Sequence, residues 1–298
     1  MNTAPSNGGD PNGTPLPMAM AGRAHGLTVR ADVLVLLPDP KSARACLEIA
    51  EDAARAIGGI LAAAHVGADP DAMIAAPEEI DVQRLRELEE GPSLERLERV
   101  ARTFEAWRQE RPDREEVPLD DCRGDLASCV RSECLRSDLV VTPAHGNMDA
   151  RDVFHDVLFN EGKLVLVPPA EGYAGNFLRH VVIGWKPHAH AEGAVLAARP
   201  WLLAAERLTV VCIDDTANSR NQTTARDMLA RLDLIGEVVA IRSDRRPVGQ
   251  TLGDYAVAVQ ASCLLIGAYR HSYLMELLFG RVTRYLLAHA RLPLMMKH

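Results

Sequence analysis

The chain has 298 residues, and at about 150 residues per domain it is long enough for two globular domains. Apolar residues make up 47% and charged residues 25%, a globular mixture that excludes a mostly disordered, collagen-like or disulfide-stapled chain. The net charge of −8 disfavours binding to nucleic acid or an anionic membrane surface, and no apolar run reaches the roughly 18 residues that span a bilayer. We expect a cytoplasmic protein whose six cysteines are ordinary reduced thiols without a zinc site.

Residues 1–27 are rich in Gly, Pro, Asn and Ser, a composition that buries little apolar surface and predicts a disordered tail. Regular structure is expected to begin with the apolar run 32–37. An uninterrupted apolar run of this length is typical of a strand covered on both faces, as in parallel sheets.

The pattern of this first segment returns 148 residues later, which indicates a duplication. Val33 corresponds to Val181, and Ile60 corresponds to Leu208. Between these positions an apolar stripe at helical spacing is matched position by position. The stripe consists of Cys46, Ile49, Ala50, Ala53 and Ile57, with Ala194, Ala197, Ala198, Trp201 and Ala205 as counterparts.

Each half adds three more strand runs, so that strands and helical patterns alternate with five strands in each half. The added runs are 116–120, 138–142 and 163–167, then 237–241, 263–266 and 292–296. The alternation predicts an α/β fold with two tandem doubly wound parallel sheets and right-handed crossovers. The predicted domains are 28–170 and 178–298, joined by a turn-rich linker over 171–177.

The halves differ most between their second and third strands, where the first half inserts the charged segment 78–116, with 13 acidic and 8 basic residues. One apolar stripe in it consists of Leu94, Leu97, Ala101, Phe104 and Trp107. The stripe predicts an amphipathic helix packed on the sheet with a solvated outer face, and a partner-binding helix is the alternative.

Signatures of catalysis are missing from the sequence. There is no G-x-x-x-x-G-K-[ST] loop, G-x-G-x-x-G fingerprint, G-x-S-x-G elbow or H-E-x-x-H motif. We expect His188 and His190 to be solvated loop histidines. A further polar group consists of His145, Asp149, Asp152, His155 and Asp156. We interpret it as a helix N-terminus whose carboxylates favour the helix dipole, with an acid–base or metal cluster as the alternative. We expect no catalytic residue and no metal.

A more specific pattern lies near the C-terminus. The strand run is followed by Gly267-Ala-Tyr-Arg-His-Ser272, and Gly280-Arg-Val-Thr283 follows nine residues after Arg270. Glycine after a strand and small polar groups at the start of a helix let backbone N–H groups approach an anion. Together with Val182–Pro187 and the segment 204–210, this pattern resembles the universal stress protein family, whose last strand-turn-helix reads G-x-x-G, nine residues, G-[ST]. The chain resembles a tandem of two such domains over 28–298, more strongly in the second half.

The resemblance implies an adenine-nucleotide-hydrolase-like fold and a role in stress resilience. In members that bind ATP, it implies that the loop glycines, a hydroxyl residue and an Asp after the first strand hold the nucleotide. Here Arg270 replaces the second glycine, Arg281 replaces the hydroxyl residue, and Trp185 with Lys186 stands where the Asp belongs. In the first half 142–146 keeps little of the loop, so the first site is predicted to be inactive.

The candidate nucleotide or anion site therefore belongs to the second half. It consists of Gly184, Trp185, Lys186, Gly267, Arg270, His271, Ser272, Gly280, Arg281, Val282 and Thr283. Two interpretations of the arginines stay open. They pair with Glu276 or solvent, or they gather at the carboxyl edge of the sheet as phosphate ligands.

We expect a non-enzymatic stress-response protein that has a degenerate nucleotide site and acts through association with other proteins. One alternative is a switch that binds ATP or another adenine nucleotide, and a slow ATPase is less favoured because no carboxylate pair for Mg²⁺ lies near Gly267. The last strand of each half is expected at a sheet edge, where unpaired strands invite pairing. We therefore expect a pseudo-dimer of the two halves and a homodimer of chains.

Overall fold

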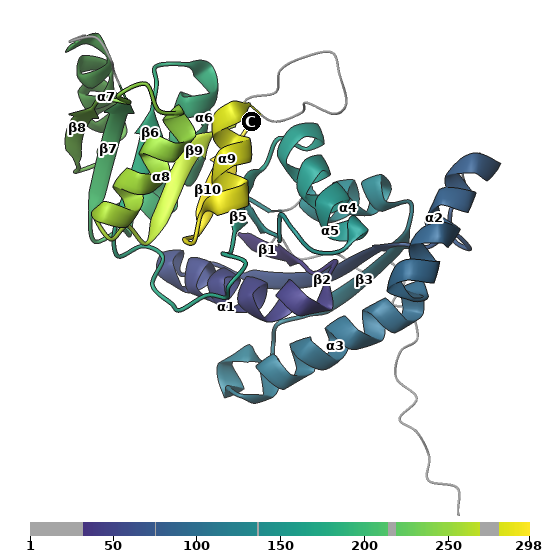
Figure 1. Ribbon diagram of the computed structural model, residues 1–298. Coiled ribbons are helices and arrows are strands. Elements are labelled where there is room, and N and C mark those ends of the chain that lie inside the picture. The colour runs from purple at the N-terminus through teal and green to yellow at the C-terminus, as the bar shows by residue number, and fades with distance from the viewer. Residues whose placement is uncertain (1–31, 75, 136, 214–218, 269–279) are drawn as a thin grey trace, which may run out of the picture.

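The computed structural model describes residues 32–74, 76–135, 137–213, 219–268 and 280–298. The chain forms one ten-stranded sheet with helices on both faces, in the strand order β3-β2-β1-β4-β5-β10-β9-β6-β7-β8 (Figure 1). The strands are β1 Val33–Leu36, β2 Leu61–Ala68, β3 Leu119–Gly124, β4 Leu139–Val141, β5 Leu164–Val167, β6 Val181–Trp185, β7 Leu208–Ile213, β8 Glu237–Ile241, β9 Cys263–Gly267 and β10 Leu294–Lys297. The predicted α/β fold is confirmed.

Helices connect these strands. They are α1 Pro40–Ile57, α2 Pro77–Glu90, α3 Ser93–Gln109, η1 Pro112–Arg114, α4 Leu126–Cys134, α5 Met148–His155, η2 Asp156–Asn160, α6 Ala189–Leu203, α7 Ser219–Arg231, α8 Val248–Ala258 and α9 Arg281–His289. Within the described ranges, no helix is long and apolar enough to cross a membrane. The predicted disordered tail 1–27 lies outside the described residues.

The two halves repeat one strand order, since β3-β2-β1-β4-β5 in the first half matches β8-β7-β6-β9-β10 in the second. The register refines the sequence alignment of the halves. Val33 pairs with Leu61, and Val181 pairs with Leu208. The counterpart of Leu208 is therefore Leu61 and not Ile60, which is 53% exposed just before the strand.

A pair of edge strands joins the halves. β5 and β10 run antiparallel, with Leu166 opposite Met295, whereas the other neighbouring strands are parallel. On one face of the sheet α1 lies beside α6, and Trp201 Nε1 donates to Ala53 O at 2.9 Å. These two residues are 148 apart and occupy equivalent positions in the repeat. Direct contact between equivalent positions indicates an approximate twofold axis between the halves.

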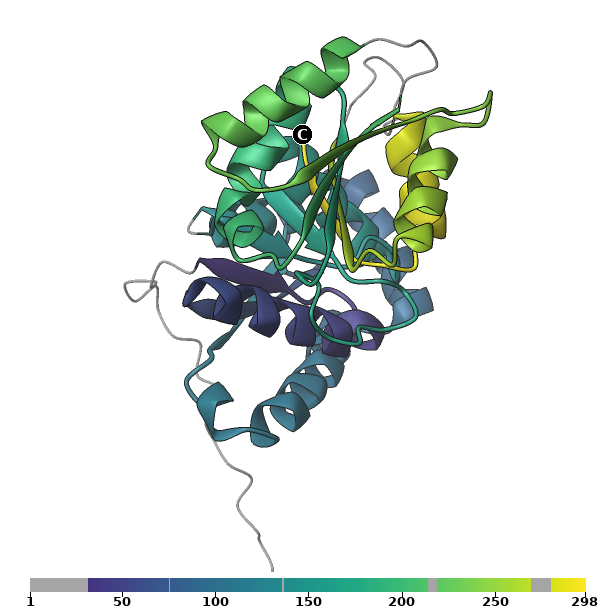
Figure 2. The ribbon, with the colours of Figure 1, turned by 90° about the vertical axis from the view of Figure 1, so that its left-hand side faces the viewer.

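Apolar side chains cover both faces of the sheet in two continuous layers. One layer contains residues of α1, α3, α6 and α7, and the other contains residues of α4, α5, α8 and α9. Figure 2 shows the second half edge-on, with α7 on one side of the strands and α8 and α9 on the other. The uninterrupted apolar strands follow from this double coverage.

The insert between β2 and β3 forms α2, α3 and η1, and α3 packs on α1. Leu97, Phe104 and Trp107 are buried as the stripe predicts, while Ala101 is half-buried and Leu94 is 53% exposed. The side chains of α3 that point inward therefore extend the layer that α1 begins.

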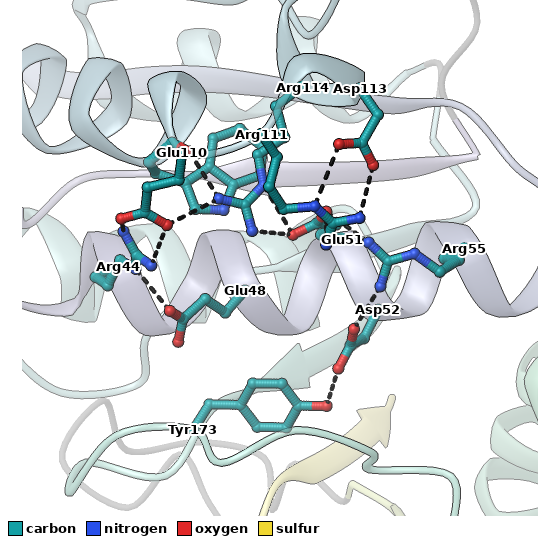
Figure 3. A network of polar contacts seen from close by, with 11 residues as sticks. Arg44, Glu48, Glu51, Asp52, Arg55, Glu110, Arg111, Asp113, Arg114 and Tyr173 are labelled. Carbon is teal, nitrogen blue, oxygen red and sulfur yellow. Dashed lines mark hydrogen bonds and ion pairs between the residues drawn. The ribbon is translucent and has the colours of Figure 1, made fainter.

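An ion-pair network holds the end of this insert on α1 (Figure 3). Arg114 donates to Glu51 at 2.6 Å and lies 4.5 Å above the ring of Trp107. Arg44 donates to both oxygens of Glu110, at 2.5 and 2.7 Å, and these bonds lower the pKa of Glu110 to about 2.

Two expectations in this region are wrong. The third strand begins at Leu119 rather than at 116, because Val117 N is taken by Arg114 O in the turn after η1. It extends instead to Gly124 through polar residues, which an edge strand with one neighbour tolerates. The cysteines are not all thiols, because Cys122 of β3 and Cys129 of α4 form a disulfide.

Candidate functional site

Doubly wound domains bind ligands at the carboxyl edge of the sheet, between the ends of the strands where the order reverses. In each half this place lies after the first strand and after the fourth. The first half places Asp39 and the loop 142–147 there, and the second half places Trp185, Lys186 and Gly267 there.

The first-half edge is closed by its own loop. Asp39 caps α1 and accepts from Lys41 N at 3.3 Å. Gly146 has a φ of 144°, and a Cβ there would lie 2.6 Å from Asp39 Oδ2. Asn147 caps α5 and donates from Nδ2 to Pro38 O at 2.9 Å. The segments that follow β1 and β4 are therefore in contact at the place where a phosphate would need space.

A buried charge cluster lies over the same edge. Asp149, in the first turn of α5, is fully buried, and Arg86 of α2 bonds its Oδ1 through Nη1. Arg96 of α3 lies 3.4 Å from its Oδ2 through Nε. Arg86 also donates to Asp152 at 2.7 Å. Burial disfavours the charged guanidinium, but the two carboxylates outweigh this effect and raise the pKa of Arg86.

Arg96 also donates to two backbone carbonyls. Its Nη2 donates to Ala68 O at the end of β2 at 2.5 Å, and its Nη1 donates to Gly91 O at 2.6 Å. The insert thus places Arg86 and Arg96 at the strand ends, where both bond to other parts of the protein. The Arg86 and Arg96 side chains are 4% and 1% exposed, so little of either guanidinium reaches solvent at this edge.

A cavity of about 220 Å³ lies beside the cluster, lined by Gln83, Arg86, Asp152 and His155 among others. Ligand pockets usually measure about 300 to 1,000 Å³, so this one is small. Its wall contains more carboxylates than cations, which disfavours an anionic ligand. No group of three or more metal-ligating side chains occurs in the part of the chain that the structure describes.

In the second half the site residues point in different directions. Trp185 is 4% exposed and donates from Nε1 to Thr224 Oγ1 of α7 at 3.2 Å, so its ring belongs to the apolar layer on that face. Lys186 is exposed. Gly184 faces the opposite layer, where a Cβ would lie 2.7 Å from Leu252 Cδ2.

Gly267 ends β9 against another helix. A Cβ at this position would lie 2.7 Å from Ala191 N and 2.8 Å from His190 C, in the first turn of α6. Only glycine permits this approach, so the first glycine of the pattern has a packing reason besides any ligand. Arg270, His271 and Ser272 lie outside the described residues.

The second element of the pattern begins α9. Gly280 is the N-cap and has no side chain with which to cap the helix, and Arg281 after it is exposed. Thr283 is 2% exposed, and Val282 packs on α8 next to Gly249. Of the predicted site residues that the structure describes, Lys186 and Arg281 therefore offer exposed cationic side chains.

Sequence reasoning missed two features of these edges. The sequence correctly places Asp149 at a helix N-terminus but does not pair it with the buried Arg86 and Arg96, because those arginines lie far from it in sequence. His188 and His190 are not loop histidines but the N-cap and first turn of α6, and their rings stack at 5.2 Å. The ring of His190 also stacks on His298 at 4.6 Å, and burial together with His298 lowers its pKa.

Comparisons with known proteins support this reading of the fold. Residues 204–298 match the model of the universal stress protein family. No curated protein sequence matches the chain. A universal stress protein from Archaeoglobus fulgidus superposes with a TM-score of 0.61 and 9% identity, covering 90% of this chain and 99% of that one.

A functionally unknown protein from Pseudomonas aeruginosa PAO1 superposes with a TM-score of 0.51 and 13% identity. The superposition covers 90% of this chain and 92% of the Pseudomonas protein. At such identities these structures establish the shared fold. The family match adds a universal stress protein domain at the C-terminal end, and the first half lies outside it.

Proposed function

We propose that this protein is a stress-response protein that acts by associating with other proteins and does not turn over a nucleotide. The observation that carries the proposal is the closed first-half edge, where Arg86, Arg96 and Asp149 are joined in internal contacts. The family match over 204–298 supports the stress-response role. In the second half, Trp185 in the apolar layer and the missing strand-end Asp support a degenerate nucleotide site.

A second candidate is a switch that binds an adenine nucleotide at the second half. The start of α9 favours it, because Gly280 leaves the first N–H groups of the helix without a side-chain cap and Arg281 is exposed beside them. A helix N-terminus with an arginine suits an anion. A slow ATPase would further need a metal-binding carboxylate set, which this edge lacks among the described residues.

Calorimetry with ATP, ADP and AMP separates these candidates. The protein is compared with an Arg270→Ala/Arg281→Ala variant and with Arg291→Ala, a control arginine that is 79% exposed elsewhere. We expect no binding heat at millimolar nucleotide. Binding that is lost in the double variant but kept in the control would overturn the proposal in favour of the switch. Phosphate release above that of a Gly280→Asp variant would instead establish an ATPase.

A further inference from the structure

Helix α2 turns its apolar side chains toward solvent and a charged side chain toward the protein, the reverse of a usual surface helix. The single buried residue of its 14 is an arginine, Arg86. Its large apolar side chains point outward, with Val82 50% exposed, Leu85 63% and Leu88 82%. Surface helices normally turn their apolar stripe toward the core and their charges toward water.

Polar bonds attach α2 to the rest of the protein. Arg86 bonds Asp149 and Asp152 of α5, and Glu90 Oε1 accepts from Met148 N at 2.7 Å. Glu87 Oε1 accepts from Ser93 N at 3.1 Å where α3 begins. No apolar side chain of α2 belongs to either apolar layer of the described structure.

The neighbouring helix makes the contrast clear. α3 belongs to the same charged insert and buries Leu97, Phe104 and Trp107 on α1. α2 instead extends away from the body beyond α3, as Figure 1 shows. A helix of this length is marginal by itself in water, so α2 depends on its anchor at Arg86. The anchor fixes the direction in which the apolar residues face.

The outer face of α2 combines apolar and acidic side chains. Val82, Leu85 and Leu88 follow one another at three-residue spacing and form a stripe about two turns long. Exposed acidic residues lie among and beside them, namely Glu78, Asp81 and Glu89. Over the whole helix, six acidic residues against two basic ones give a net charge of −4.

We propose that the outer face of α2 binds a basic amphipathic helix of a partner protein, which lays an apolar stripe on Val82, Leu85 and Leu88 and places Lys or Arg opposite the acidic residues. This inference rests on the proposed function, because it names the surface through which the protein associates. Charge complementarity selects the partner. A second copy would oppose two helices of net charge −4 in a chain of net charge −8, so the same face of another copy is disfavoured.

The test uses a synthetic helix-forming peptide of about 18 residues, with Leu at helical spacing and Lys and Arg elsewhere. Two control peptides accompany it, one with the same composition in scrambled order and one with Glu in place of the basic residues. The protein is compared with Leu85→Ser/Leu88→Ser, whose changes lie on the exposed face. The matched protein control is Leu196→Ser/Val257→Ser, which removes two apolar side chains, 60% and 64% exposed, from α6 and α8.

We expect the basic amphipathic peptide to bind the protein and the matched control equally, and to bind Leu85→Ser/Leu88→Ser at least tenfold more weakly. Binding should weaken as salt rises, because the flanking contacts are ionic. Equal binding of the scrambled peptide, or unchanged binding to the α2 variant, would overturn the proposal. So would a protein dimer in sedimentation that the α2 variant abolishes, because a second copy would then occupy the face. The nucleotide titrations stay independent of this result, so the two proposals fail separately.

Discussion

The charge cluster at Asp149 gives the most decisive test of the structure. Asp149→Asn keeps the volume of the side chain, so no cavity forms, but it removes the negative charge shared by Arg86 and Arg96. Asp149 is fully buried, and the two guanidinium groups are 4% and 1% exposed. Removing one partner of a buried ion pair costs about 3 to 5 kcal/mol, because the remaining charge stays buried without compensation.

The matched control is Asp152→Asn, which makes the same chemical change on the same guanidinium. The Asp152 side chain is 55% exposed, so water compensates for the lost contact. An exposed pair of this kind contributes up to about 1 kcal/mol. Urea unfolding followed by circular dichroism yields the free energy of unfolding from the midpoint and the slope for each variant.

We expect Asp149→Asn to lose at least three times as much stability as Asp152→Asn, with the slope of the transition unchanged. Equal and small losses in the two variants would refute the reasoning, since they would mean that Asp149 is not a buried charge held by the insert. A loss confined to Asp152→Asn would refute it as well.

Three further predictions concern other contacts. Reduction of Cys122–Cys129 should lower the free energy of unfolding by about 2.5 kcal/mol, the loop-closure value for a bridge of this sequence separation, and the reductant should not affect a variant with both cysteines replaced by alanine. Glu110→Gln should lower the urea midpoint at pH 7, because the variant loses the charge that pairs with Arg44. Arg44 holds the pKa of Glu110 at about 2, so Glu110 itself loses this charge as the pH falls from 4.5 toward 2. The difference in midpoint between the two proteins should therefore vanish over that range. Met295→Glu should destabilise the protein by about 4 kcal/mol or more, since this 1% exposed side chain sits where the halves join, and unchanged melting and sedimentation would contradict that.

Much of the architecture follows from the sequence alone. The runs in β1, β4, β5 and β9 are apolar throughout, and strands covered on both faces require this. The repeat at 148 residues places the matching helices α1 and α6. The stripe in α3 identifies its buried face, because helical spacing gathers those side chains on one side. These features depend on neighbours in sequence, so their pattern is readable without the fold.

The candidate site was less accessible to such reasoning. The glycine pattern correctly places the end of a strand at Gly267, but it does not reveal that the first turn of α6 packs against this glycine. Trp185 is the last residue of β6, and the sequence pattern predicts it near a ligand. Side chains alternate along a strand, however, and the ring of Trp185 lies in the apolar layer with α7.

Only the tertiary structure decided the charge cluster, the disulfide and the direction of α2. Arg86 and Asp149 lie 63 residues apart, so no local pattern pairs them. Helical spacing shows that Val82, Leu85 and Leu88 share a face, but whether that face turns inward depends on what else anchors the helix. Here the buried Arg86 bonds Asp149 and Asp152 of α5, and this leaves the apolar residues of α2 facing solvent. Long-range ion pairs set this orientation because they form between elements that only the folded chain brings together.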